Sequence, residues 1–172
     1  FHIELELFGD IGLIGLPNAG KSSLLNAVTN ATAKIGDYAF TTLDPNLGDF
    51  FGYIIADIPG LIEGASDGKG LGVKFLKHIK RTKKLLHLVS FENEYIETGK
   101  MMKVYKEIRK ELKTYGNGLD EKDEIILLTK TDVIEDPKII AKRVKEFEKL
   151  GKQVMTLSLY DTDSMEAFKK EL

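Results

Sequence analysis

The chain of 172 residues contains no cysteine. Disulfide bonds and thiolate metal sites are therefore excluded, and the composition fits a reducing cytoplasm. No apolar run approaches the roughly 20 residues that span a bilayer, and no basic segment followed by an apolar core predicts a signal peptide. We therefore expect a cytoplasmic protein without a membrane partner. A strong charge of one sign is missing too, since the formal net charge is −2. Composition alone does not point to nucleic acid.

Hydrophobic residues make up 42% of the chain and charged residues 30%, which is an ordinary globular balance. The length is enough for one domain with a substantial core. The first residue is Phe1 and not methionine, so we expect the chain to be a piece of a longer protein. Residues 1–8 are interpreted as a lead-in segment or the end of a preceding domain, and residues 9–172 as one domain.

Strand and helix patterns alternate along the chain, which is typical of an α/β layered fold. Apolar runs predict strands at 10–15, 53–57, 85–89, 124–128 and 153–157, and a hairpin places a further strand near 47–51. Apolar residues at helical spacing predict helices from Lys21, over 101–115 and after Asp136, and a capping box of Asp163 and Glu166 predicts a terminal helix. We expect about six strands, mostly parallel, with helices on both faces and one antiparallel edge strand near 47–51.

The segment "GLPNAGKS" at 15–22 satisfies the pattern G-x-x-x-x-G-K-[ST]. A loop around phosphates must offer backbone N–H groups at close range, which favours glycine, and the following helix adds its N-terminal dipole. Lys21 can reach the β- and γ-phosphates, and Ser22 offers a hydroxyl to Mg²⁺. A glycine-rich turn without a ligand is the alternative. The strand before the segment and the helix after it favour the phosphate loop and a P-loop NTPase fold.

Asp57 opens "DIPG" at the end of another predicted strand, where it can hold Mg²⁺ through a water. A plain β-turn is the alternative, and the preceding phosphate loop disfavours it. Between the two motifs, Thr41 and Thr42 offer hydroxyls for a further Mg²⁺ ligand in a loop that orders around the γ-phosphate.

The segment "TKTD" at 129–132 follows the next apolar strand. The carboxylate of Asp132 can accept hydrogen bonds from N1–H and the exocyclic amine of guanine, a pair that adenine lacks. The stem of Lys130 can lie along the ring. The three motifs together predict a guanine nucleotide site.

These residues resemble the GTPase domain of the Obg family, which are relatives of the Ras-like G proteins. The matching stretches are "GDIGLIGLPNAGKSSLLNAV", "IGDYAFTTLDPNLG", "ADIPGLIEGASDGKGLGVKFLKHIKRTKKLLHLV" and "TKTD", and the likeness runs from about Ile3. The resemblance implies a Ras-like fold and a slow, monomeric GTP-hydrolysing switch that acts in assembly of the large ribosomal subunit. It also implies that 9–172 is an Obg-type GTPase domain, whose N-terminal glycine-rich domain and any C-terminal domain are not in this segment. A guanine-nucleotide sensor with negligible hydrolysis remains the alternative.

The resemblance also implies the site residues. They are Gly15, Leu16, Pro17, Asn18, Ala19, Gly20, Lys21, Ser22 and Ser23 at the phosphates; Phe40, Thr41, Thr42, Leu43 and Asp44 in the first switch; Asp57, Ile58, Pro59 and Gly60 at the γ-phosphate; Thr129, Lys130, Thr131 and Asp132 at guanine; and Ser158, Leu159 and Tyr160 completing the base pocket. Ser22, Thr42 and Asp57 would hold Mg²⁺. Asn18, Lys21, Thr42 and Gly60 would serve catalysis.

Three positions depart from the family pattern. Thr129 stands where the family often has asparagine, so one hydrogen bond between the base loop and the phosphate loop is expected to change. Leu159 stands where alanine is usual, in a place that contributes a backbone N–H and tolerates a larger side chain. Asp44 replaces an apolar residue.

Leu61 follows "DIPG", where many nucleotide switches have a glutamine that orients the attacking water. Leucine cannot hydrogen-bond a water, and the lysine-rich helical contexts of Arg81, Arg109 and Arg143 favour solvated helix faces over an arginine finger. In related G proteins, an asparagine at the position of Asn18 coordinates K⁺, whose charge replaces that of the finger. The alternative is that this asparagine only shapes the loop.

Two basic features are interpreted as structural. The histidines His2, His78 and His87 are scattered without metal-ligand spacing. The positive stretch 77–84 is interpreted as a solvated helix end, with contact to ribosomal RNA as the alternative.

Overall fold

The computed structural model describes residues 10–16, 18–29, 34–35, 46–51, 53–57, 82–116 and 118–172. Several sequence predictions fall outside these ranges. They concern Pro17, the first-switch residues 40–44, Ile58, Pro59, Gly60 and Leu61, and also His2, His78, Arg81 and the stretch 77–81.

A seven-stranded sheet forms the centre of the described structure, in the order β2-β3-β4-β1-β5-β6-β7. Strands β4, β1, β5, β6 and β7 run parallel to one another, whereas β3 is antiparallel to β4 and to β2. The strands are β1 (Ile11–Gly15), β2 (Lys34–Ile35), β3 (Asn46–Phe50), β4 (Tyr53–Asp57), β5 (Lys84–Ser90), β6 (Asp123–Thr129) and β7 (Gln153–Leu157).

The predicted α/β fold with a mostly parallel sheet is confirmed. The sheet has one strand more than expected because the two-residue strand β2 pairs with β3 and takes the edge. The antiparallel hairpin strand β3 therefore lies one position inside the edge and not at it. Two residues are too short a run for any sequence periodicity to reveal, which is why β2 was missed.

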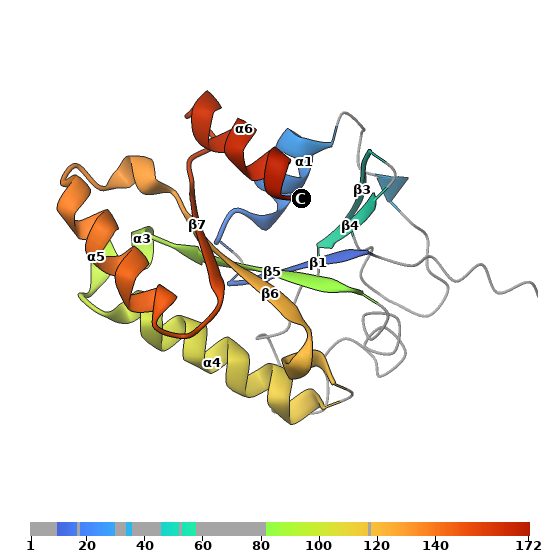
Figure 1. Ribbon diagram of the computed structural model, residues 1–172, viewed down its shortest axis with the longest axis horizontal. Coiled ribbons are helices and arrows are strands. Elements are labelled where there is room, and N and C mark those ends of the chain that lie inside the picture. Colours follow the sequence, from blue (N-terminus) through green and yellow to red (C-terminus); the bar gives the residue numbers. More distant parts are fainter. Residues whose placement is uncertain are drawn as a thin grey trace, which may run out of the picture.

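Helices cover both faces of this sheet (Figure 1). Helices α1 (Lys21–Val28) and α6 (Thr162–Glu171) lie on one face, and α3 (Glu92–Ile96), α4 (Lys100–Tyr115) and α5 (Pro137–Glu148) lie on the other. Two apolar clusters follow this division, because Leu24 and Phe168 belong to one and Tyr105 and Phe147 to the other. Short 3₁₀ turns, η2 (Leu119–Glu121) and η3 (Thr131–Val133), flank β6.

The helix ends follow local chemistry. Helix α4 stops before Gly116, whose φ of 67° suits glycine. The N-cap of α5 is Asp136, as predicted, and its side chain accepts a hydrogen bond from the backbone N–H of Lys138. The predicted capping box of α6 is wrong. Asp161 is the N-cap, and it accepts from the backbone N–H of Asp163, which already lies inside the helix.

Two arginines are not on solvated helix faces, which corrects the sequence interpretation. Arg143 is 7% exposed and pairs with Glu94 of α3 and with Glu146. Arg109 donates from Nη2 to the Asp120 carbonyl at 2.7 Å, and its Nη1 lies 3.3 Å from Glu124 Oε2. The acidic partners Glu94 and Glu124 lie outside the helices that carry these arginines, so the lysine-rich neighbourhoods of the arginines were misleading.

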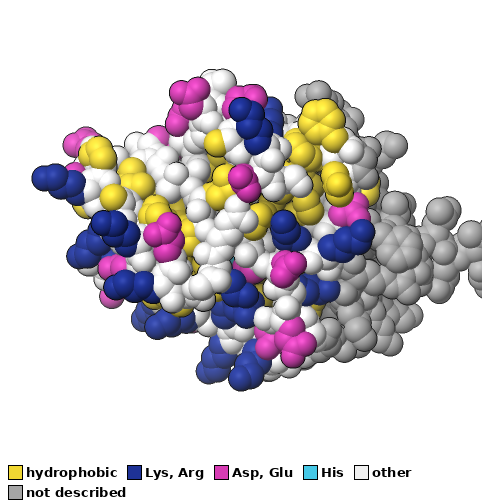
Figure 2. Space-filling view, in the orientation of Figure 1, with side chains coloured by type: hydrophobic (Ala, Val, Ile, Leu, Met, Phe, Trp, Pro, Cys, Tyr) yellow, Lys and Arg dark blue, Asp and Glu magenta, His cyan; other side chains and the backbone are white. Residues whose placement is uncertain are grey.

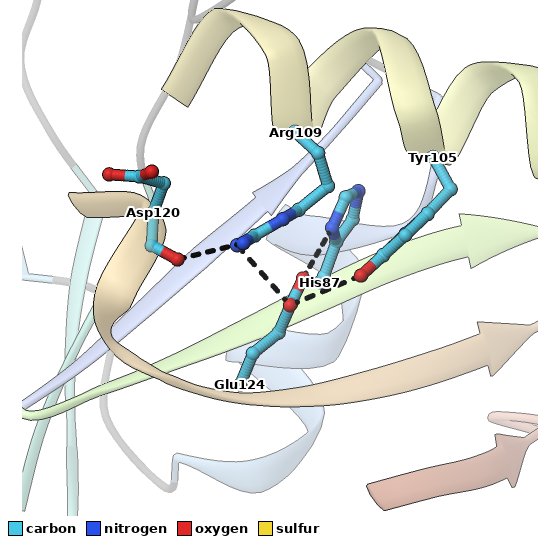
Figure 3. A network of polar contacts seen from close by, with 5 residues as sticks. All are labelled: His87, Tyr105, Arg109, Asp120 and Glu124. Atoms are coloured by element: carbon cyan, nitrogen blue, oxygen red, sulfur yellow. Dashed lines mark hydrogen bonds and ion pairs between the residues drawn. The ribbon is translucent and has the colours of Figure 1, made fainter. Parts of the chain in front are cut away.

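His87 belongs to the same buried network, on β5 beneath α4 (Figure 3). Its Nδ1 lies 2.8 Å from Glu124 Oε1, and the Tyr105 hydroxyl donates to Glu124 Oε2 at 3.2 Å. Complete burial lowers the pKa of His87, although Glu124 opposes this shift. Burial also acts to raise the pKa of Glu124, but the hydrogen bond from His87 and the charge of Arg109 outweigh it and the pKa falls. The network therefore holds a neutral imidazole against an ionised carboxylate.

Within the described ranges, the longest helices are too short or too polar to cross a bilayer.

Candidate nucleotide site

The predicted phosphate loop connects β1 to α1 at the carboxyl edge of the parallel strands. Gly15 ends β1 against β5, where a Cβ atom would lie 2.6 Å from the Leu88 carbonyl oxygen, so only glycine fits. The Ala19 N–H donates to the Leu16 carbonyl at 2.9 Å and closes a turn. Helix α1 then begins at Lys21 without a side-chain cap, which leaves its N-terminal dipole facing the loop.

Lys21 is almost fully buried, with 5% of its surface exposed. Its Nζ donates to the carbonyl oxygens of Gly15 at 2.8 Å and Leu16 at 3.2 Å. Burial lowers the pKa of this ammonium group, and the nearby Asp57 carboxylate opposes the shift. A buried cation without a full counter-charge is suited to an anionic ligand.

Ser22 and Asp57 meet beside this lysine. The Ser22 hydroxyl donates to Asp57 Oδ2 at 3.0 Å, which joins the start of α1 to the carboxyl end of β4. Asp57 is 4% exposed, and its Oδ1 is buried without a hydrogen-bond partner among the described residues. The Ser22 hydroxyl and the Asp57 carboxylate, with its unsatisfied buried oxygen, are oxygen donors of the kind that Mg²⁺ prefers. This ion needs few protein ligands when phosphates and waters complete its coordination. No group of three His, Cys, Asp or Glu side chains suited to a metal occurs in the part of the chain that the structure describes.

The other end of the site is built around Asp132. Its Oδ1 accepts a hydrogen bond from the Ser158 hydroxyl at 2.8 Å, and the Ser158 oxygen accepts in turn from the Tyr160 N–H at 3.2 Å. The Ser164 hydroxyl, on α6, lies 3.1 Å from the Ser158 N–H and 3.0 Å from its carbonyl oxygen. Asp132 itself is exposed. One carboxylate oxygen is therefore held by the protein and the other is open to a ligand.

A buried hydrogen bond ties these two ends together. The Thr129 hydroxyl, at the end of β6, donates to the Ala19 carbonyl in the phosphate loop at 2.8 Å. This is the position where the resemblance implies asparagine, and threonine still supplies one hydrogen bond between the loops. The phosphate loop and the base loop thus have a fixed relative position.

A cavity of about 310 Å³ opens between the two ends. Its wall on the α1 side includes Gly20, Ser23 and Leu24. Its opposite wall includes Lys130, Asp132, Leu157, Leu159 and Tyr160. The size is at the lower end for small-molecule sites. Such a cleft beyond the carboxyl ends of parallel strands is where α/β sheets bind ligands.

Comparison with known proteins agrees with this geometry. A sequence model described as "50S ribosome-binding GTPase" matches residues 10–130. The chain belongs to this GTPase family.

Two curated relatives of this GTPase domain are both named GTPase Obg. The protein of Pelagibacter ubique (strain HTCC1062) is 46% identical over 99% of the chain and 52% of its own length. The protein of Rickettsia bellii (strain RML369-C) is 47% identical over 92% of the chain and 48% of its own length. The resemblance to the Obg family is confirmed, and the chain spans about half the length of these relatives.

Solved structures share the fold. The G domain of the T. maritima FeoB iron transporter is 21% identical, with a TM-score of 0.60 over 94% of each chain. An S. thermophilus NFeoB mutant bound to GDP is 20% identical, with a TM-score of 0.64 over 93% of this chain and 58% of its own. At this identity the likeness establishes the Ras-like G-domain fold.

The GTPase domain brings together every predicted site residue that the structure describes, all at the carboxyl edge of the sheet. Leu159 and Tyr160 lie at the cavity, 40% and 90% exposed. Asn18 is exposed in the phosphate loop. The remaining predicted residues, Pro17, Phe40, Thr41, Thr42, Leu43, Asp44, Ile58, Pro59 and Gly60, lie outside the described ranges.

Sequence reasoning missed Glu92. Its Oε2 lies 2.7 Å from Lys130 Nζ, and it lines the cavity of this GTPase domain. The Ser90 hydroxyl, at the end of β5, accepts from the Glu92 N–H at 3.1 Å. Glu92 could have been predicted from its position just after the parallel strand β5. This strand lies between β1 and β6, which carry the phosphate and base loops.

Proposed function

We propose that the chain binds GTP and hydrolyses it slowly to GDP and phosphate, and that its two nucleotide states form a molecular switch. The observation that carries this proposal is the cavity between the phosphate loop at Ala19 and Gly20 and the base loop at Asp132, two loops that the Thr129–Ala19 hydrogen bond joins. Membership of the GTPase family supports the choice of nucleotide.

The phosphate end would bind mainly through the protein's own backbone. Residues 15–23, apart from Pro17, offer backbone N–H groups to the β- and γ-phosphates, and the N-terminal dipole of α1 adds to them. The Lys21 ammonium group, which is held by two loop carbonyls at 2.8 and 3.2 Å, would turn toward phosphate oxygens. Its low exposure strengthens this attraction, because little water screens it.

Ser22 and Asp57 would hold Mg²⁺, with Thr42 as a further ligand predicted from the sequence. The ion would offset the negative charge on the β- and γ-phosphates. The unsatisfied Oδ1 of Asp57 is the feature of this chain that supports the assignment. Residues 57–60 would sense the γ-phosphate.

Asp132 would select guanine by accepting hydrogen bonds from N1–H and the exocyclic amine. Ser158 orients its carboxylate, and the salt bridge between Lys130 and Glu92 holds the lysine stem along one wall of the cavity. Leu159 and Tyr160 would complete the base pocket.

Hydrolysis would be slow because Leu61 cannot orient a water and the two described arginines are engaged elsewhere. K⁺ held by Asn18 is our proposed source of positive charge. Asn18 is exposed in the loop, and its side chain makes no hydrogen bond with any described residue, so its amide oxygen is available. Thr42 and Gly60 remain predicted contributors through their backbone and hydroxyl groups.

The proposed partner is the large ribosomal subunit, engaged by the full-length protein in the cytoplasm. The family description and the relatives' name support this partner. A monomeric state and the boundary near residue 9 remain predictions from the sequence.

Turnover of GTP and ATP in K⁺ or Na⁺ tests the proposal. We expect GTP turnover on the order of 10⁻⁴ to 10⁻³ per second, as in unassisted small G proteins, with K⁺ faster than Na⁺ and no use of ATP. Asn18→Ala should remove the K⁺ effect and keep GDP binding, whereas Lys21→Ala should abolish tight binding. Equal GTP affinity in wild type and Lys21→Ala would overturn the site.

The alternative function is a guanine-nucleotide sensor that hydrolyses only with a partner's help. Leu61 is the residue that favours it. Tight GTP binding with no turnover in either K⁺ or Na⁺ would support the sensor over the autonomous hydrolase.

A further inference from the structure

Eight exposed lysines lie on the two long helices that cover one face of the sheet. Helix α4 carries Lys103, Lys106, Lys110 and Lys113, and helix α5 carries Lys138, Lys142 and Lys145 with Lys149 at its C-cap. We call these eight residues the lysine surface. Their spacing of three or four residues places each set along one side of its helix.

The two helices form one continuous layer. Tyr105 of α4 and Phe147 of α5 meet edge to face at 5.6 Å between ring centroids. Both belong to the same apolar cluster beneath the layer. Figure 2 shows many basic side chains, with acidic ones between them, over the part of the molecule where Figure 1 draws α4 and α5. The lysine surface is therefore a single face of the protein.

This concentration of charge is local. The whole chain has a formal net charge of −2, so the positive charge of this face is balanced elsewhere. None of the eight ammonium groups forms an ion pair with a residue that the structure describes. Acidic side chains also lie on these helices, Glu107 and Glu111 on α4 and Glu146 and Glu148 on α5, but the eight lysines outnumber them. Glu146 pairs with Arg143, and the buried Glu94 and Glu124 pair with Arg143 and Arg109.

Like charges at three- and four-residue spacing repel one another and destabilise a helix. The lysine surface contains such pairs in succession on both helices, for example Lys138 with Lys142 and Lys106 with Lys110. A polyanion that neutralises them would relieve this repulsion and release its own counterions.

We propose that the lysine surface binds the phosphate backbone of RNA. A protein partner fits less well, since lysine is depleted at protein interfaces and these need apolar anchors. Among the described side chains of α4 and α5, the one exposed large hydrophobic residue is Ile139, at 39%. Lysines without interleaved aromatic residues contact phosphates and do not read bases, so binding is independent of sequence. The choice of RNA rests on the proposed ribosomal role, whereas the anion-binding face rests on the charges alone.

Binding of the chain to 20-base-pair RNA duplexes of two unrelated sequences, measured by fluorescence anisotropy over a KCl series, tests the proposal. The variant Lys142→Gln/Lys145→Gln removes two charges from the centre of α5. It should weaken RNA binding about tenfold or more at 100 mM KCl and lower the slope of log K against log salt by about two. Both sequences should bind alike.

The matched control is Lys169→Gln/Lys170→Gln on α6, which makes the same change in net charge on the other face of the sheet. It should leave the salt slope unchanged. An equal loss of RNA affinity in the two double variants would mean that only the overall charge matters, and would overturn the proposal. The absence of RNA binding by the wild type at 50 mM KCl would also overturn it. Tighter binding of the lysine surface to phosphatidylserine vesicles than to RNA would also overturn it.

GDP affinity measured on the same variants separates this proposal from the GTP site. Both double variants should bind GDP as the wild type does, because all four lysines lie outside the cavity. RNA binding without nucleotide binding would support the RNA-binding proposal and contradict the GTPase proposal. Nucleotide binding without RNA binding would support the GTPase proposal and contradict the RNA-binding proposal.

Discussion

At the scale of single residues, Ser158 decides how Asp132 faces a base. The Ser158 hydroxyl donates to Oδ1 of Asp132 at 2.8 Å, so the protein fixes the orientation of this carboxylate before a base binds. The same arrangement would orient an asparagine at this position. Its amide oxygen would accept from Ser158 and, with its second lone pair, from N1–H of the base, while its NH₂ group would face the exocyclic position.

Asp132→Asn should therefore change the preferred base from guanine to xanthine, and not merely abolish the preference for guanine. We expect GTP affinity to fall by about 100-fold or more, because the negative charge is lost and the amide NH₂ group cannot accept from the exocyclic amine. Xanthosine triphosphate, which carries a carbonyl where guanine has an amine, should become the preferred ligand. Competition against a fluorescent GDP analogue measures both affinities.

Ser158→Ala serves as the companion variant. It should lower GTP affinity by about tenfold, the value of one hydrogen bond to a charged group, and it should weaken xanthosine triphosphate binding when combined with Asp132→Asn. Continued preference of Asp132→Asn for GTP would place the base reader elsewhere.

At the scale of elements, α5 holds α3 in place through a buried ion pair. Arg143 of α5 pairs with Glu94 of α3, and their side chains are 8% and 5% exposed. Glu94 also accepts from the Gly99 N–H at 2.9 Å, which fixes the turn into α4. Glu92 lies on the same short helix α3 and reaches the cavity, so this ion pair supports the wall of the nucleotide site.

Arg143→Met should destabilise the protein by about 3 kcal/mol or more, because Glu94 would be left buried without its counter-charge. Urea unfolding followed by circular dichroism measures the change. Adding Glu94→Gln should recover much of the loss, since no uncompensated charge would remain. The control Lys142→Met, an exposed neighbour on α5, should change stability by less than about 0.5 kcal/mol. A similar loss in both single variants would mean that the ion pair does not stabilise the fold.

Local patterns predicted the elements well and the contacts between them poorly. The run Gln153–Leu157 was predicted residue for residue, and the cap at Asp136 and the stop at Gly116 were correct. These features depend on neighbouring residues and appear in short windows of sequence. The predicted phosphate and base motifs converge because parallel strands present their carboxyl ends together.

The errors share a physical cause, which is that distant partners are invisible in local sequence. Arg143 pairs with Glu94 across 49 positions, and Thr129 donates to Ala19 across 110. Glu92 became a site residue only through its contact with Lys130. The α6 cap was misplaced because Asp161 and Asp163 are both good capping residues, and the geometry of the turn after β7 selects the first.

At the scale of the whole molecule, the network around His87 links stability to pH. The pKa of the buried His87 is lowered below the ordinary value of about 6.5, which the unfolded chain recovers. The unfolded state therefore binds more protons between these two values, and the free energy of unfolding falls as the pH falls. The contribution is fully present above about pH 6.5 and is lost below it, by up to about 1.4 kcal/mol per pH unit.

Thermal or urea unfolding between pH 7.5 and pH 5 should show this loss in the wild type. His87→Asn keeps a donor toward Glu124 but cannot gain a proton in this range. We expect it to be less stable at pH 7.5, because the smaller side chain leaves a cavity, and to depend less on pH between 7 and 5. The lowered pKa of Glu124 acts only below about pH 4.5 and does not confound this window. Parallel curves for the two proteins would assign the pH dependence to other groups.

The anchoring of Ser158 by Ser164 has a consequence for biosynthesis. A growing chain releases the phosphate loop early, and domains fold as units while they are made. Asp132 follows much later, and its partner Ser158 and the support from α6 come later still, between Ser158 and Glu171. A nascent chain halted before Ser158 would already carry the lysine and the carboxylates but would lack the hydroxyl that aims Asp132. Discrimination among nucleotides is thus acquired later in synthesis than the phosphate loop and the Mg²⁺ carboxylate.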